Sequence, residues 1–343
     1  MKGIAVLEEI VLPIGKPFIL GYQHHANPLS VLACDEDYLT WLYCNYIQLF
    51  YDPRSITYFN FYFNGFVPNF FTVSNPLLDI QILKKESVFA DIVDYVFYLL
   101  SSGKYFETSI NEYYIKSRSS YLVNNFDHEI LVYGCNIKDK YFCTLGYDRR
   151  GLYSAAKISF EDFETAYKNT GSHPYSQMIR IYERKKVKGK KYVFKFDIQL
   201  VHMLLSDYLS AYNTSERLRM IAPPLEGCLF GVEACKKLLG LLENLLNGSI
   251  EYDIRPFHIL WEHKTCMVRR INYMIENEYL PCNKDVKQFE NIENDALNLK
   301  HMLIKWSISR NNMIIKKMIS VLMEMIEKEY KALSNVLLSI NIT

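Results

Sequence analysis

The stretch HEILVYGCNIKDKYFCTLGYD, residues 128–148, decides the fold of the first half of the chain. Two runs rich in β-branched and aromatic residues flank a short polar segment, a pattern typical of an antiparallel β-hairpin. The polar segment centres on Lys138, so residues whose numbers add to the same value are expected to face each other. The stretch therefore predicts an antiparallel sheet.

This register brings a histidine and an aspartate together at the open end of the hairpin. His128 is expected opposite Asp148, and cross-strand partners project from the same side of a sheet. A carboxylate beside an imidazole fixes its tautomer and stabilises its protonated form. The pair predicts the base of a nucleophilic site and the residue that orients it. A purely structural histidine is the alternative.

Local patterns predict the elements around the hairpin. Residues 87–103 have helical spacing and are expected to end with Gly103 as C-cap. Ser159 is expected to cap the next helix, with Asp162 as its capping partner. A second hairpin follows, with its turn near Gly189.

The second half of the chain has helical periodicity from Gln199 onward. We expect a mixed α+β domain over residues 1–205 and a helical domain over residues 206–343, with the boundary between Phe196 and Pro223. The predicted helices cover residues 199–212, 231–246 and 262–280, and a long C-terminal helix with the apolar stripe Met318, Leu322, Met325, Ile326 and Leu333. This stripe is interpreted as helix packing or as the seam of a homodimer.

A second stretch, GYQHHANPLSVLAC at residues 21–34, contains a helix start. Asn27 is expected as N-cap and Pro28 as the first helical residue. The preceding position would then face the positive end of a helix, where a thiolate is stabilised. The residue at this position is Ala26, which has no nucleophilic atom.

Composition excludes several classes of protein. The formal net charge of the 343 residues is +1, which argues against a dedicated nucleic-acid binder. The N-terminal apolar run is interrupted by Glu8 and Glu9, unlike a secretory signal, and no apolar run approaches the roughly 20 residues of a membrane helix. The eight cysteines have no zinc-finger spacing. We expect a cytoplasmic protein without a metal or other cofactor.

Six stretches, taken in their order along the chain, carry a family resemblance: HHANPLSVLA, WLYCNYIQL, the 128–148 hairpin, ISFEDFETAY, FGVEACKKLL and DIRPFHILWEHKTCMVRRINYM. They resemble those of the papain-like proteins and, within them, the butirosin-biosynthesis-H-type acyltransferases. The likeness is greatest to the amide synthases of closthioamide (thioamide antibiotic) biosynthesis. It implies that residues 1–205 form a papain-like catalytic core.

The resemblance implies a mechanism. The family has its nucleophilic Cys where this chain has Ala26, with His128 as base and Asp148 as the residue that orients it. The thiol attacks an acyl thioester on the phosphopantetheine arm of an acyl or peptidyl carrier protein, and a small diamine then takes the acyl group as an amide. Gln23, His25 and Asn27 are candidate oxyanion or substrate ligands.

The alanine leaves two origins open, a natural pseudoenzyme or a Cys-to-Ala variant made to trap a substrate. Either form is expected to be inactive. A non-catalytic scaffold protein and a cysteine peptidase are the alternative functions.

Other features have weaker functional interpretations. Cys34 is the second candidate nucleophile, but the acidic residues after it would raise a thiol pKa. A zinc site formed by His24, His25 and His128 lacks paired ligand spacing. The basic run at residues 183–191 is interpreted either as a docking patch for an acidic carrier protein or as a solvated hairpin tip.

Overall fold

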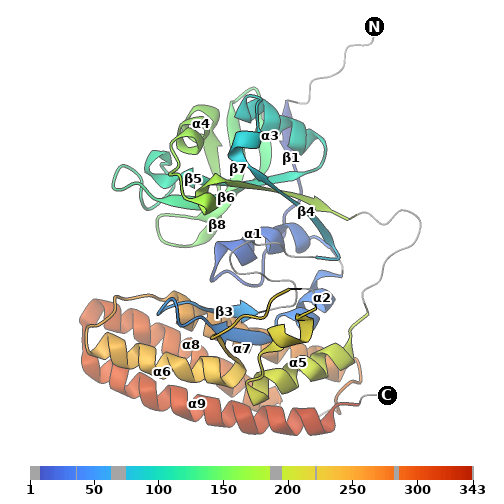
Figure 1. Cartoon of the computed structure of the whole chain (residues 1–343), viewed down its shortest axis with the longest axis vertical. Helices are drawn as coiled ribbons and strands as arrows, with labels where there is room; N and C mark the ends of the chain where they lie inside the picture. The colour runs from blue at the N-terminus through green and yellow to red at the C-terminus, as the bar shows by residue number, and fades with distance from the viewer. Residues whose placement is uncertain are drawn as a thin grey trace. The chain divides into compact units, whose positions relative to one another are not determined.

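The structure is a computed structural model that describes residues 8–35, 37–62, 75–185, 195–220, 222–281 and 286–341. It is a mixed α+β protein with antiparallel sheets, as the sequence predicted (Figure 1). The chain divides into two compact units, and each is built from two separate segments. Unit 1 comprises Met1–Tyr38 and Gly65–Tyr192, and unit 2 comprises Leu39–Asn64 and Val193–Thr343.

Unit 1 contains a seven-stranded antiparallel sheet in the order β4-β9-β5-β6-β7-β8, with β1 paired to β6. Its strands are β1 (Glu9–Val11), β4 (Leu78–Lys84), β5 (Tyr105–Asn111), β6 (Asp127–Asn136), β7 (Tyr141–Tyr147), β8 (Tyr153–Ser159) and β9 (Met178–Arg184). Its α-helices are α1 (Gln23–Leu32), α3 (Ile92–Ser101) and α4 (Phe160–Lys168), and its short 3₁₀ turns are η1 (Lys85–Ser87), η2 (Glu112–Tyr114) and η3 (Pro174–Gln177).

The two faces of this sheet differ in chemistry. Alternate strand residues such as Phe106 and Ile130 pack with α3 and α4 into the main apolar core of the unit. The residues next to them in sequence, Glu107 and Glu129, are buried acids, and α1 contacts β6, β7 and β9. Because successive side chains of a strand point to opposite faces, α1 covers a face that carries buried charge.

The predicted hairpin is confirmed as β6 and β7. Its open half has the predicted register, since Leu131 faces Leu145. Nearer the turn, a β-bulge shifts the register by one residue, so that Gly134 faces Cys143. A Cβ at Gly134 would lie 2.6 Å from a backbone oxygen of β1, so the glycine lets β1 approach β6.

Two of the local helix signals of unit 1 are confirmed, the glycine after α3 and the cap of α4, whereas α3 begins later than residue 87, at Ile92, with Asp91 as its cap. α3 is followed by Gly103 with φ of 77°, and the Lys104 N–H donates to the Leu99 carbonyl. The Ser159 hydroxyl accepts a hydrogen bond from the Asp162 N–H at 3.1 Å, which caps α4. β9 begins where the second hairpin was predicted, but its turn near Gly189 and most of the basic run lie outside the described residues.

Unit 2 combines a small antiparallel sheet, in the order β10-β2-β3, with long helices that pack on one another (Figure 1). The strands are β2 (Gln48–Tyr51), β3 (Phe59–Tyr62) and β10 (Leu229–Phe230). The helices are α2 (Tyr38–Asn45), α5 (Ile198–Ser210), α6 (Gly231–Leu246), α7 (Arg255–Glu276), α8 (Val286–Ser309) and α9 (Asn312–Ser339), and η4 spans Thr214–Leu218. The predicted C-terminal stripe is buried along α9. Among the residues described, no helix has the length and hydropathy of a membrane span.

The division into units differs from the expected one at residue 205. Residues 39–64 belong with the C-terminal helices because β2 and β3 pack against α5, α6 and α7. All four residues of β3 are buried, as are three of the four in β2. Strands covered on both faces lack the alternation of hydrophobic and polar residues that marks one buried face. The sequence of β2 and β3 therefore gives no local sign that they pack against helices over 130 residues away.

A polar network lies at the centre of unit 2. The Lys264 ammonium lies 2.7 Å from both carboxylate oxygens of Glu329 and donates to the Tyr208 hydroxyl at 2.9 Å. The Tyr208 hydroxyl donates to Glu329 in turn, and His263 Nδ1 lies 3.2 Å from the same ammonium. Each of these side chains is fully or almost fully buried. The two charges therefore depend on each other for compensation.

Unit 1 also contains a buried lysine. Lys85 donates to the Ser109 carbonyl and the Thr170 hydroxyl, and its ammonium lies 4.2 Å from the centre of the Tyr167 ring. Burial lowers the pKa of Lys85 to about 7, and the nearby Asp127 opposes this effect. The folded protein therefore loses this proton at a much lower pH than the unfolded chain does.

Replacing Lys85 with Met is expected to change how stability depends on pH. From about pH 7 to about pH 10.4, the unfolded chain holds a proton that the folded protein has released, so raising the pH favours the folded state. The free energy of unfolding of the wild type relative to K85M should rise across this window, by at most about 1.4 kcal/mol per pH unit. Below it the difference should be constant. Denaturant titrations at several pH values measure this, with the exposed Lys84→Met as control. A difference that stays flat throughout would contradict the prediction.

Candidate functional site

The helix that carries position 26 begins earlier than predicted. Tyr22 is the N-cap and Gln23 the first residue of α1. The Ala26 N–H donates to the Tyr22 carbonyl at 3.0 Å, so Ala26 lies inside the first turn. The prediction that Asn27 caps the helix and Pro28 begins it is therefore wrong, although position 26 remains within the turn on which the helix dipole acts.

The reason is that the side chain of Asn27 bonds to the sheet and does not cap the helix. Its amide donates to Glu107 at 2.7 Å, and its oxygen accepts from the Tyr153 hydroxyl at 2.8 Å. Glu107 in turn bonds to Arg180 at 2.6 Å. Burial raises the pKa of Glu107, and the Arg180 charge opposes this rise. These contacts anchor α1 to β5, β8 and β9, and they engage both the amide nitrogen and the oxygen of Asn27. A ligand role of Asn27 stays a prediction.

The other predicted ligands on α1 are also engaged by the protein. The Gln23 amide donates to the Glu129 carbonyl at 2.5 Å, which directs this donor at the sheet. His25 is almost fully buried and its ring centre lies 4.5 Å from that of His24. Burial lowers the pKa of His24 well below its usual value, and His25 and Arg180 add to this effect. In the described ranges, no group of three His, Cys, Asp or Glu side chains is placed to hold a metal ion.

His128 lies at the start of β6 with a quarter of its side chain exposed. Its ring centre lies 5.7 Å from that of Tyr147, in a stacked arrangement, and 5.3 Å from that of Phe126. The carboxylate at hydrogen-bond distance is that of Glu112, whose Oε1 lies 3.2 Å from Nδ1. On the other edge, Nε2 lies 3.8 Å from Glu129.

Asp148 does not pair with His128 in the structure. Its carboxylate accepts hydrogen bonds from Arg150 and from the Leu152 N–H, within the turn between β7 and β8. The Leu152 N–H and the Arg150 contacts lower the pKa of Asp148. The pairing of β6 with β7 ends at Leu131 and Leu145, so the predicted register does not extend to His128 and Asp148.

Arg118 lies where the predicted pair was expected to form. Its guanidinium is buried, donates to the Tyr147 carbonyl, and has Nε 3.9 Å from Glu112 Oε1. A Cβ at Gly146 would overlap this guanidinium, so the glycine makes room for it beside β7. Glu112 and Arg118 were missed because both lie between β5 and β6, Glu112 in the short turn η2 and Arg118 in an irregular segment. The available signal was an acid, Glu112, directly after the strand at residues 105–111.

The described cysteines do not replace the missing nucleophile. Cys34, the second candidate, is partly buried, and burial raises its pKa. Burial raises the pKa of every other described cysteine as well: Cys44, Cys135, Cys143, Cys228, Cys235 and Cys266. A raised pKa reduces the thiolate fraction and hence the reactivity of a thiol.

Comparison with known proteins finds no family model and no curated protein that matches this chain.

Proposed function

We propose that unit 1 is a papain-like acyl-transfer domain in which position 26 is the nucleophile position and His128 is the base. The reaction of a Cys-bearing form is transfer of an acyl group from a carrier-bound thioester to a small diamine. The present chain has Ala26, so it binds these ligands and does not turn them over.

The observation that supports the proposal is the link between the first turn of α1 and His128. The Gln23 amide donates to the carbonyl of Glu129, the residue after His128. The Tyr147 ring stacks on His128, and its hydroxyl donates to the Leu20 carbonyl at 2.5 Å, just before the helix. Side chains three residues apart lie on one side of a helix, so Ala26 shares the side on which Gln23 reaches β6.

The proposed reaction of a thiol at position 26 has two acyl-transfer steps. The helix dipole lowers the pKa of a thiol in the first turn, and burial at this position, where Ala26 is fully buried, opposes that effect. His128 takes the thiol proton, sulfur attacks the thioester carbonyl, and the carrier thiol leaves with that proton. The amine then attacks the acyl-cysteine, losing a proton through His128 to the departing Cys sulfur. An amide bond forms and the free thiol returns.

The test is to place Cys at position 26 and follow the intact mass of the protein. Incubation of A26C with acyl thioesters of a carrier protein is expected to add one acyl group. Addition of 1,3-diaminopropane should then discharge this group as an amide. Adding His128→Ala to A26C should slow loading about 100-fold or more. The Ala26 form and A26S are matched controls, because both keep the other cysteines and lack the new thiol.

An A26C protein that folds normally and stays unmodified with carrier-bound thioesters would contradict the proposal. A scaffold function is the second candidate, favoured by Ala26 itself and by the raised pKa values of the described cysteines. It predicts that the Ala26 form binds acylated carrier protein and that A26C gains no reactivity.

A further inference from the structure

We infer that Glu112, and not Asp148, is the positioning residue of His128. The inference rests on the proposed function, because it names the group that orients the base of that site. Glu112 Oε1 lies 3.2 Å from His128 Nδ1, and the carboxylate is 4% exposed. A buried carboxylate at this distance holds the proton on Nδ1 and leaves Nε2 as the basic nitrogen.

The backbone fixes Glu112 next to the histidine. Glu112 begins η2, and its N–H donates to the Phe126 carbonyl at 2.8 Å, two residues before His128. Asn111 caps this turn by accepting from the Tyr113 N–H, and its amide donates to the Asn169 carbonyl. The backbone at Glu112 is therefore held by hydrogen bonds to the residue before β6 and, through Asn111, to the segment after α4.

The ring of His128 is held by the same structure. Phe126 and Tyr147 contact it, and Glu112 is at its Nδ1 edge. Nε2 is 3.8 Å from Glu129, which is beyond hydrogen-bond distance. Of the two nitrogens, Nε2 is therefore the one left for proton transfer.

Arg118 contacts the groups that hold the His128 ring. Its Nε lies 3.9 Å from the Glu112 oxygen that reaches His128. Arg118 also donates to the carbonyl of Tyr147, whose ring stacks on the histidine. One buried cation thus contacts both groups that hold the imidazole. Asp148 is engaged instead with Arg150 and Leu152 in the adjacent turn.

The experiment compares Glu112→Gln with Asp148→Asn, using two readouts. In protein labelled with ¹⁵N-histidine, NMR reports which ring nitrogen of His128 carries the proton. In E112Q, the neutral amide lacks the charge that holds the proton on Nδ1, so the population of the Nε2 tautomer should rise. In the A26C background, E112Q should lower acyl loading about 100-fold or more, while D148N stays within about threefold. Glu112→Asp keeps the charge and should restore the Nδ1 tautomer and part of the loading, which separates positioning from loss of fold.

The outcomes distinguish this inference from the proposed function. A tautomer that depends on Glu112 in a protein whose A26C form never loads would support the positioning role and remove the acyl-transfer function. Normal loading of A26C that D148N abolishes and E112Q leaves unchanged would overturn the assignment of Glu112 and retain the function. An Nδ1 tautomer unchanged in folded E112Q would also overturn the assignment.

Discussion

Replacing Glu329 with Gln is expected to destabilise unit 2 by about 3–5 kcal/mol. The carboxylate is fully buried and lies 2.7 Å from the buried ammonium of Lys264. An amide of the same size leaves this ammonium without a compensating charge, while the surrounding helices prevent water from reaching it. Chemical denaturation followed by far-UV circular dichroism measures the loss, because α5 to α9 supply most of the helical signal.

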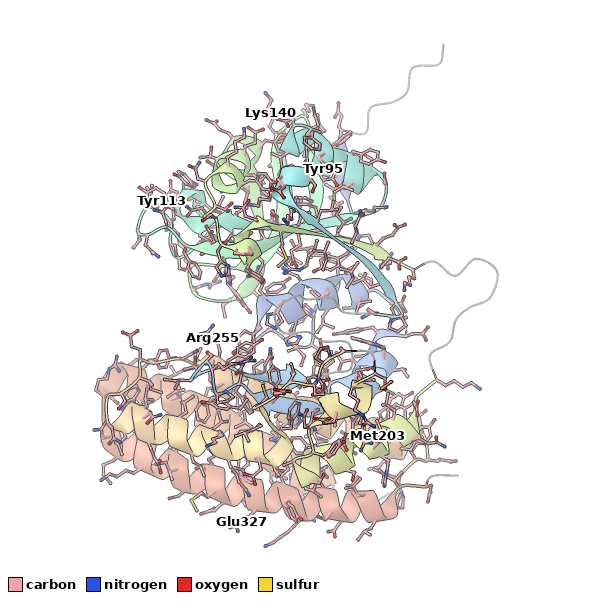
Figure 2. All side chains as sticks on the ribbon, viewed as in Figure 1. Tyr95, Tyr113, Lys140, Met203, Arg255 and Glu327 are labelled. Carbon is pink, nitrogen blue, oxygen red and sulfur yellow. The ribbon has the colours of Figure 1, made fainter. Side chains whose placement is uncertain are left out.

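Glu327→Gln is the matched control, since Glu327 lies on the same helix and is exposed (Figure 2). Its effect should stay within about 0.5 kcal/mol. The double variant K264M/E329L removes both charges together and should recover the larger part of the lost stability. An E329Q protein within about 1 kcal/mol of the wild type would show that the charge of Lys264 is compensated by another group.

Replacing Gly231 with Ala is expected to destabilise unit 2 by about 3 kcal/mol or more, from left-handed strain together with overpacking. Gly231 begins α6 with φ of 55°, a backbone conformation that L-residues rarely adopt. A Cβ there would also overlap the Tyr208 carbonyl, whose carbon would lie 2.7 Å away. Tyr208 belongs to the Lys264–Glu329 network, so relief of this clash would disturb the charges as well.

Gly240→Ala provides the same substitution in the same helix with the opposite expected sign. An added Cβ at Gly240 meets no atom within 4 Å among the described residues. Alanine should therefore stabilise the helix by about 0.8–1 kcal/mol. Thermal or denaturant unfolding of the two variants in parallel measures the contrast. Equal effects at the two positions would contradict the close packing at the start of α6.

The elements predicted correctly are those with short-range causes. The polar turn of the hairpin, the cap at Ser159 and the glycine after α3 each act within a few residues, so the sequence shows them directly. The start of α1 was misplaced for a tertiary reason. Asn27 has the side chain of an N-cap, but Glu107, 80 residues later, provides a stronger partner in the folded protein.

The contacts of His128 were predicted only in part, because its carboxylate partner is also set by tertiary structure. His128 is beside a carboxylate, as the sequence predicted, but the carboxylate is that of Glu112. The expected register of the hairpin placed Asp148 opposite His128, on the assumption that the two strands stay paired to the open end. A buried guanidinium from Arg118 at that end has no signature in strand periodicity, and neither does the carboxylate that it supports.

The interleaving of the two units along the chain has a consequence for the order of folding during synthesis. β2 and β3 leave the ribosome early, yet the helices that cover them begin only at residue 198. Unit 1 can close its sheet once β9 is made, whereas β2 and β3 are covered only after the C-terminal half has been made. A nascent chain that stalls after β9 and before the C-terminal helices exposes two apolar strands with unpaired edges. Chaperones bind such exposed strands, and without chaperones the strands promote aggregation.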